Sequence, residues 1–190
     1  SGSTLGVTTL TDALATANVT VQTGAGGAEA GDIIVSAAIN WDAPTLLTLV
    51  AHRDVVVKAA ITANDPEGKI KLRADSTGSG TGTVIFDTAE VARAKGGVEI
   101  LYNPTAYTSP SDYTVNIEPE TPLTAYMLVN TVQNLQSIGA VKATHSYNYA
   151  LGRDIDAAET ATWNAGRGFR PIGTSMYGGI GPVAFTGIFD

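Results

Sequence analysis

A repeat of 22 to 23 residues in the first half of the chain limits the folds that this sequence can adopt. Residues 31–39 (GDIIVSAAI) recur 22 positions later at 53–61 (RDVVVKAAI), and residues 47–51 (LTLVA) recur 23 positions later at 70–74 (IKLRA). Each copy contains two strand-sized blocks of aliphatic residues separated by a turn, which is typical of a solenoid. Because one such unit cannot bury its own apolar face, the copies are expected to stack.

Stacking places equivalent residues of successive copies about 4.8 Å apart. We therefore expect Ile33 to lie over Val55, and Ile39 over Ile61, in continuous aliphatic ladders. Observing antiparallel hairpins or a helical layer at these positions would contradict the prediction.

The repeat also aligns polar residues at the turns. Asp32 and Asp54 are equivalent, and they are predicted either to cap successive turns by accepting backbone N–H groups or to share a cation between them. His52 aligns with Asp75, which makes it a turn position. Neither His52 nor His145 has the HxxxH or HExxH spacing of a zinc site.

Composition agrees with a strand-rich chain and excludes several classes of function. Charged residues make up 15% of the 190 residues, below the roughly 25% of ordinary globular proteins, and there are 21 Gly. The formal net charge of −7 argues against a nucleic-acid partner and against a polybasic membrane patch. The sequence has no Cys, which excludes disulfides, thiolate metal sites and thiol catalysis. No run of 18 apolar residues predicts a membrane span.

The chain is predicted to divide at one proline-rich break. We interpret residues 1–4 as a tag remnant and lead-in, 5–117 as stacked coils, 118–122 (EPETP) as the break, and 123–190 as further coils. Within the last part, 131–139 is predicted to be a short helix that begins at Asn130 or Thr131 and ends at Gly139. That helix and residues 10–23 are candidates for the caps or corners that open strand edges require.

Aromatic residues are the candidate binding residues. Exposed rings could form a sugar-stacking platform, whereas buried rings would belong to the core or cover an edge. The residues proposed for binding are Tyr102, Tyr107, Tyr113 and Trp163. The segment 102–113 is also braced by prolines, so it is predicted to be rigid.

Two carboxylates are the candidate metal ligands. Asp154 and Asp156 would share one face of a strand, as a Ca²⁺ site on a polysaccharide-cleaving enzyme requires, or would cap a turn at the end of a strand. No cofactor other than this possible Ca²⁺ is predicted. The sequence lacks a GxSxG motif, a phosphate-binding loop and a dinucleotide fingerprint, and we predict that the chain is not an enzyme.

The residue order resembles that of filamentous-haemagglutinin-like adhesins, which are passengers of two-partner secretion. The similarity is carried by the segments NVTV, GDIIVSAAINWDAPTLLTLVAHRDVVVKAAIT, VEILYNPTAYTSPSDYT, LVNTVQNLQSIG, YNYALGRDIDAAETATWNAGRGFRPIG and FTGIFD. The resemblance implies an all-β right-handed parallel β-helix with short helical or irregular caps and loop insertions.

The same resemblance implies a structural and adhesive fragment of a large secreted bacterial surface protein. Its partners would be neighbouring coils of the same polypeptide, an outer-membrane transporter during export, and an unknown receptor or glycan. Two alternatives remain open at this point: a carbohydrate-binding module of such an adhesin, and a Ca²⁺-dependent polysaccharide-active β-helix enzyme.

Overall fold

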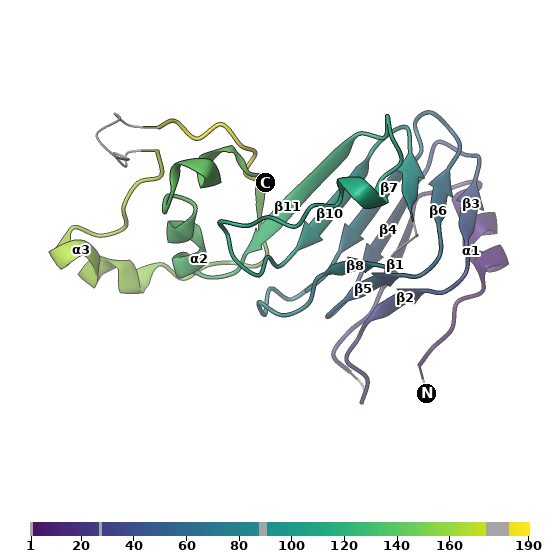
Figure 1. Cartoon of the computed structure of the whole chain (residues 1–190). Helices are drawn as coiled ribbons and strands as arrows, with labels where there is room; N and C mark the ends of the chain where they lie inside the picture. The colour runs from purple at the N-terminus through teal and green to yellow at the C-terminus, as the bar shows by residue number, and fades with distance from the viewer. Residues whose placement is uncertain (1, 27, 88–90, 174–182) are drawn as a thin grey trace.

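The computed structural model describes residues 2–26, 28–87, 91–173 and 183–190. Its gaps fall within the predicted lead-in (residue 1) and within the two predicted coil ranges, 5–117 and 123–190. The described chain is mostly β-strand arranged in parallel sheets, with few helices (Figure 1).

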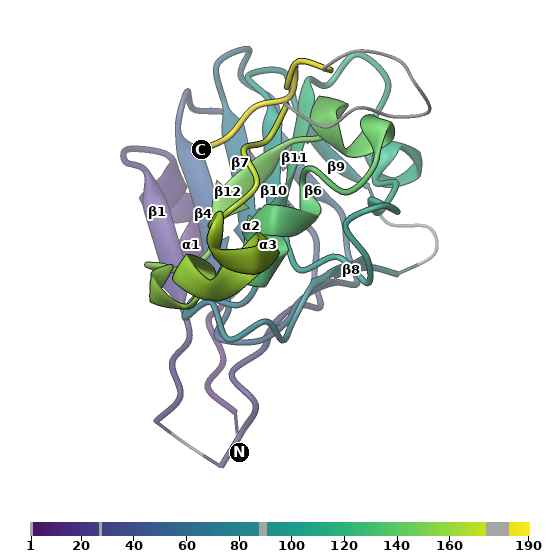
Figure 2. The same cartoon turned by 90° about the vertical axis from the view of Figure 1, so that its left-hand side faces the viewer.

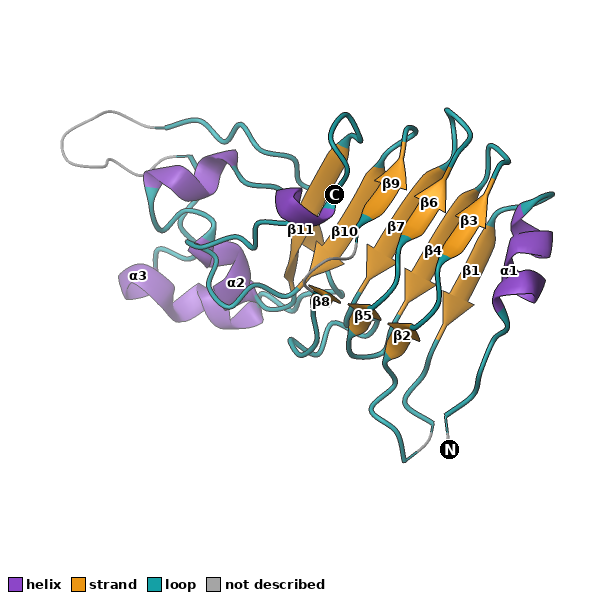
Figure 3. Cartoon of the chain, turned by 45° about the vertical axis from the view of Figure 1, so that its right-hand side comes forward, coloured by secondary structure: helices purple, strands orange, loops and turns teal. Residues whose placement is uncertain are grey.

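Three parallel sheets make up the strand-rich part. The first, six-stranded sheet has the order β1 (Val19–Gln22), β4 (Leu46–Val50), β7 (Lys69–Arg73), β10 (Val98–Tyr102), β11 (Leu123–Val129) and β12 (Tyr149–Leu151). The second sheet contains β2 (Ile33–Val35), β5 (Val55–Val57) and β8 (Val84–Phe86). The third contains β3 (Ile39–Trp41), β6 (Ile61–Ala63) and β9 (Ala92–Ala94). Figure 3 shows the strands of the first sheet side by side.

The chain passes through the second, third and first sheets in the same order three times, as β2–β3–β4, β5–β6–β7 and β8–β9–β10. The predicted stacking is confirmed, because Ile33 pairs with Val55 and Ile39 pairs with Ile61 in parallel register. Pairing continues to a third unit, in which Val55 lies beside Val84. The longer loop after β7 hides this third unit from a search for a fixed period.

The core lies between the sheets and consists of the inward residues of successive strands. Alternate residues of each strand point inward. The fully buried members of these ladders include Leu47, Ile70, Leu72, Val55, Val57, Ile61 and Ala63. Burying each large aliphatic side chain contributes roughly 1.5–3 kcal/mol, so most of the stability comes from contacts between adjacent units.

The aspartates of the repeat cap the turns, which is one of the two alternatives predicted from the sequence. Asp32 Oδ1 accepts the backbone N–H of Asp54 at 3.1 Å, and Asp54 Oδ1 accepts that of Thr83 at 2.8 Å. The guanidinium of Arg53 lies within 2.6 Å of Asp32 and 3.1 Å of Asp54. Its hydrogen bonds lower the pKa of the Asp32 carboxyl. A side-chain cation therefore occupies the place where a shared metal ion was the alternative.

A second polar ladder, with Asp75 and Asn130 buried and Asn103 half-buried, lies where the strands of the first sheet end. Asp75 is fully buried, has φ +49°, and accepts hydrogen bonds from the backbone and hydroxyl of Ser79, from Gly80 and from Asn103. Asn130 Nδ2 donates to Asn103 Oδ1 at 2.7 Å. Val50 pairs with Arg73, so His52 and Asp75 are equivalent, as the sequence predicts.

Helix α1 (Val7–Leu14) covers one end of the stack (Figures 1 and 3). Leu10 and Leu14 are buried and the helix packs against β1 and β3. Thr45 Oγ1 donates to the Leu14 carbonyl at 2.6 Å, which fixes the end of the helix. The predicted cap at 10–23 thus consists of the end of a helix followed by strand β1.

The opposite end differs from the predicted run of coils. Residues after β11 form α2 (Val132–Ser137), α3 (Trp163–Gly166) and the 3₁₀ helices Lys142–Ser146 and Ala158–Thr162, and another 3₁₀ turn, Thr114–Asn116, precedes β11. Figure 2 shows α2 and α3 in front of the sheets. The predicted helix at 131–139 is confirmed, with Thr131 as N-cap in a capping box with Asn134. Toward the end of the predicted coil range 123–190, Phe189 makes a parallel bridge to Tyr149.

The proline-rich segment 118–122 connects two sheets of the same stack. Ile117 bridges Ala92 of the third sheet, and the Pro122 carbonyl accepts the N–H of Val98 in the first sheet. The segment therefore occupies the corner between two sheets, where tight turns suit Pro and where no strand hydrogen bond is lost.

Candidate functional site

The tyrosines of the predicted platform lie in the core. Tyr102 and Tyr113 are 1% and 6% exposed, and their rings meet edge to face with centroids 5.1 Å apart. Tyr102 Oη accepts the N–H of Ser111, and Tyr113 Oη donates to the Val84 carbonyl. Burial raises the pKa of Tyr113 to about 12. These rings hold the 103–117 loop against the sheets, and their faces are covered.

Tyr107 belongs to a neighbouring aromatic layer. Its ring stacks on Tyr149 at 6.2 Å and an interplanar angle of 27°, and its hydroxyl donates to the Leu128 carbonyl. Phe185 and Phe189 contact the same Tyr149 ring. Burial raises the pKa of Tyr107. The layer continues the core where the second and third sheets have ended, so these tyrosines serve packing.

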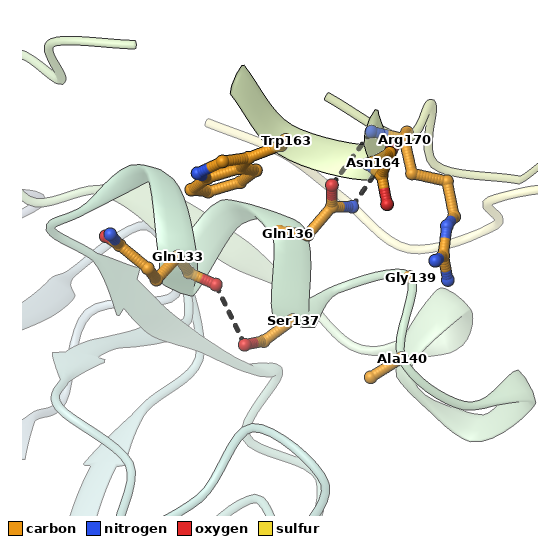
Figure 4. A pocket seen from close by; sticks show the side chains of 8 residues that line it. All are labelled: Gln133, Gln136, Ser137, Gly139, Ala140, Trp163, Asn164 and Arg170. Atoms are coloured by element: carbon orange, nitrogen blue, oxygen red, sulfur yellow. Dashed lines mark hydrogen bonds between the residues drawn. The ribbon is translucent and has the colours of Figure 1, made fainter. Parts of the chain in front are cut away.

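Trp163 is separate from the tyrosines and lines a hollow of about 500 Å³ between α2 and α3 (Figure 4). Its side chain is partly exposed. The hollow is lined by Gln133, Gln136, Ser137, Gly139, Ala140, Trp163, Asn164 and Arg170. Its volume is within the range of pockets that hold small ligands. Of these lining residues, Trp163 alone was predicted from the sequence as a binding residue.

Side-chain amides hold the two walls of the hollow together. Gln136 donates from Nε2 to the Arg170 carbonyl at 3.0 Å and accepts the Arg170 N–H at Oε1 at 2.8 Å (Figure 4). Gln133 Nε2 donates to Glu159 Oε1 at 2.6 Å. All three hydrogen bonds join α2 to the segment that follows β12. The position of Arg170 is thus set from a helix that lies 34 residues earlier in the chain.

The backbone beside Trp163 is in the left-handed region. Asn164 and Ala165 have φ of 54° and 59°, so α3 is not a regular right-handed helix. Asn tolerates this conformation, and its Nδ2 donates to the Gly168 carbonyl at 2.7 Å. Ala does not favour it, at a cost of roughly 1–2 kcal/mol. Strain of this kind is common at ligand-binding positions.

Arg170 gives the hollow a positive charge. Its side chain is exposed, and its guanidinium has no hydrogen-bond or ion-pair partner among the residues that the structure describes. An aromatic face and an unpaired guanidinium can together hold a ligand that has both an apolar surface and an anionic group.

The aspartates proposed for Ca²⁺ do not share a strand face. Strand β12 ends at Leu151, so Asp154 and Asp156 lie in the irregular segment after it. Asp156 Oδ1 accepts the N–H of Ala158 at 2.9 Å, which is the turn-capping alternative. Within the described ranges no group of three or more His, Asp or Glu side chains could hold a metal ion. Of the histidines, His145 is buried with Nδ1 2.8 Å from the Val183 carbonyl.

Comparison with known proteins gives one partial similarity. A stretch of 63 residues, 33% of this chain, is 41% identical to halomucin of Haloquadratum walsbyi, and it spans 1% of the length of that protein. No family model matches the chain, and no solved structure matches it. In the described part of the chain, no helix is long and apolar enough to cross a membrane.

Proposed function

We propose that this chain is a right-handed parallel β-helix that serves as a scaffold module in a large secreted, surface-displayed adhesin. The observation that carries the proposal is the recurrence of one parallel register through three successive units in three sheets. Such an array is rigid, grows by adding units, and leaves its loops free to vary. The role is mechanical, without enzymatic activity.

The partial similarity to halomucin supports membership of a very long protein, since the matched stretch is 1% of that protein. Export through an outer-membrane transporter, and a bacterial two-partner secretion system, are the parts of the proposal that derive from the resemblance to haemagglutinin-like adhesins. The absence of Cys from the sequence agrees with a passenger that stays unfolded until export.

Deleting one complete unit tests the scaffold. Removing residues 31–52 deletes β2, β3 and β4, and Val19 of β1 could then pair with Ile70 in place of Leu47. A β-helix made of stacked units is expected to close around this deletion and to retain parallel β-structure with a cooperative, weaker unfolding transition. A deleted chain that has no cooperative transition would refute the stacking model.

Surface display is tested on intact source cells. An antibody raised against this chain is expected to label unbroken cells, and external protease is expected to remove the signal. Labelling that requires cell lysis would contradict display. In-frame removal of the segment encoding residues 31–190 is expected to reduce attachment of the cells to surfaces; unchanged attachment would contradict the adhesive role.

The hollow at Trp163 favours a second candidate function, carbohydrate binding by the same module. Trp163 is the one predicted aromatic binding residue whose ring lines a described hollow without being buried in the core. Pyranose rings present an apolar face that stacks on Trp, and the amides around the hollow are suited to hydroxyl groups. Isothermal titration of neutral oligosaccharides against the wild-type chain and Trp163→Ala tests it, and binding that survives the substitution would refute this site.

A further inference from the structure

The charge and the hydrogen bonds of the residues that line the α2–α3 hollow specify its ligand more closely than the class of neutral sugars. The amides of Gln136 and Asn164 are engaged with the backbone carbonyls of Arg170 and Gly168. The Gln133 amide is engaged with Glu159. Each of these amides still has a second N–H, but the Arg170 guanidinium is the charged donor among the lining residues, and it is unpaired within the described ranges.

Arg170 is held in place although its side-chain head is unpaired. Gln136 clamps both the N–H and the carbonyl of Arg170, so the start of the side chain is fixed at the rim (Figure 4). The backbone of Arg170 is fixed while its guanidinium has no partner in the described ranges, which leaves the fork of N–H donors for a ligand. Carboxylates match this fork with two parallel hydrogen bonds.

The overall charge of the chain argues against nonspecific attraction of anions. The formal net charge is −7, so a polyanion is repelled by the molecule as a whole. An anionic ligand must therefore be selected by a local site, in which Trp163 supplies a stacking face and Arg170 supplies the charge.

We propose that the α2–α3 hollow binds a saccharide that carries a carboxylate, such as a uronic acid residue. The pyranose face lies on Trp163, and the carboxylate pairs with the Arg170 guanidinium. This inference rests on the carbohydrate-binding candidate above and is independent of the scaffold role.

The test compares two ligands and four proteins by isothermal titration. The ligands are a short oligomer of galacturonic acid and the neutral galactose oligomer of the same length and linkage. The proteins are the wild-type chain, Trp163→Ala, Arg170→Gln and Arg167→Gln. Arg167 is an exposed arginine near the hollow but not among its lining residues, so Arg167→Gln is the matched control for loss of one positive charge.

The expected result is that the acidic oligomer binds wild type more tightly than the neutral oligomer does, and that added salt weakens its binding. Arg170→Gln is expected to lose about tenfold or more in affinity for the acidic oligomer alone, because it loses a hydrogen bond between charged groups. Trp163→Ala is expected to lose affinity for both oligomers, and Arg167→Gln is expected to match wild type.

Three outcomes would overturn the inference. Equal loss in Arg167→Gln and Arg170→Gln would show nonspecific attraction. Binding of both oligomers with equal affinity would refute the role of the ligand carboxylate and leave only the general sugar site. If neither oligomer binds to wild type, both the carboxylate specificity and the sugar site are refuted. Thermal unfolding of each variant reports whether it is folded. A change in tryptophan fluorescence, to which Trp163 and the buried Trp41 both contribute, gives a second measure of binding to wild type and Arg170→Gln.

Discussion

The buried carboxylate of Asp75 provides the strictest test of how the stack is held together. It accepts four hydrogen bonds of 2.7 to 2.8 Å, two from Ser79 and one each from Gly80 and Asn103. Asp75→Ala removes both carboxylate oxygens and with them all four hydrogen bonds. Ser79 and Gly80 are exposed in the 76–82 loop, so their donors can turn to water. The half-buried Asn103 amide keeps its hydrogen bond to the Gly82 carbonyl, but its second N–H loses its partner.

Leaving a buried donor unpaired costs about 1–3 kcal/mol, and placing Ala at φ +49° adds about 1 kcal/mol. We therefore expect Asp75→Ala to lower the free energy of unfolding by about 2–4 kcal/mol. Urea unfolding followed by circular dichroism measures it. The carboxylate of the half-buried Asp65 accepts a single N–H, that of Glu67, so Asp65→Ala is the control and is expected to cost about 1 kcal/mol or less.

Asp75→Asn separates charge from shape at the same position. Asn tolerates a left-handed backbone, so the conformational cost disappears. The new amide needs an acceptor, which Asn103 can supply by rotating its own amide. Asn130 can rotate in turn, since its Oδ1 has no partner in the described chain. The loss should be about half that of Asp75→Ala. Equal losses in Asp75→Ala and Asp65→Ala would refute the reasoning.

Three further outcomes follow from the core and from the titrating groups. Leu72→Ala should lower the free energy of unfolding by about 2–5 kcal/mol because Leu72 is fully buried, whereas Ile34→Ala, at 56% exposed, should change it by less than about 1 kcal/mol; equal effects in urea unfolding would contradict the assigned faces. The pKa of Asp32 is lowered by Arg53, so its contribution is present above the unfolded value near 3.8 and is lost as pH falls further; unfolding curves of Arg53→Gln should lack this increment of acid sensitivity, and curves parallel to wild type would contradict it. Burial raises the pKa of Tyr113 to about 12, so its contribution is complete below pH 10 and is lost as pH rises toward 12. A tyrosinate absorbance difference titration of wild type against Tyr113→Phe should be centred well above pH 10, and one centred near 10 would contradict this.

The stack could be predicted from the sequence because its cause is local and periodic. Two copies of the same aliphatic pattern at a constant offset require equivalent residues to meet, and Ile33 and Val55 do meet. The third unit was harder to predict, since the inserted 76–82 loop changes the offset. That loop has its own physical support in the hydrogen bonds from Ser79 and Gly80 to Asp75.

The hollow could be predicted only in part. Trp163 stood out as an aromatic residue, but the clamp between Gln136 and Arg170 joins segments 34 residues apart and follows no repeat. The left-handed backbone at Asn164 and Ala165 also leaves little trace in the sequence, because Ala does not favour that conformation. From the sequence, the tyrosines could form either an exposed sugar-stacking platform or part of the core. Only their position where the second and third sheets end decides between these two interpretations.

The polar ladder also gives a physical reason why the regular stack changes at β12. Asp75, Asn103 and Asn130 follow β7, β10 and β11, and each side chain hydrogen-bonds the next. The equivalent position after β12 is Gly152, since Val129 pairs with Leu151. A Cβ at Gly152 would lie 1.8 Å from Asn130 Oδ1, so no further amide fits there. The ladder therefore ends at Asn130, and the residues that follow β12 form the short helices that complete the hollow around Trp163.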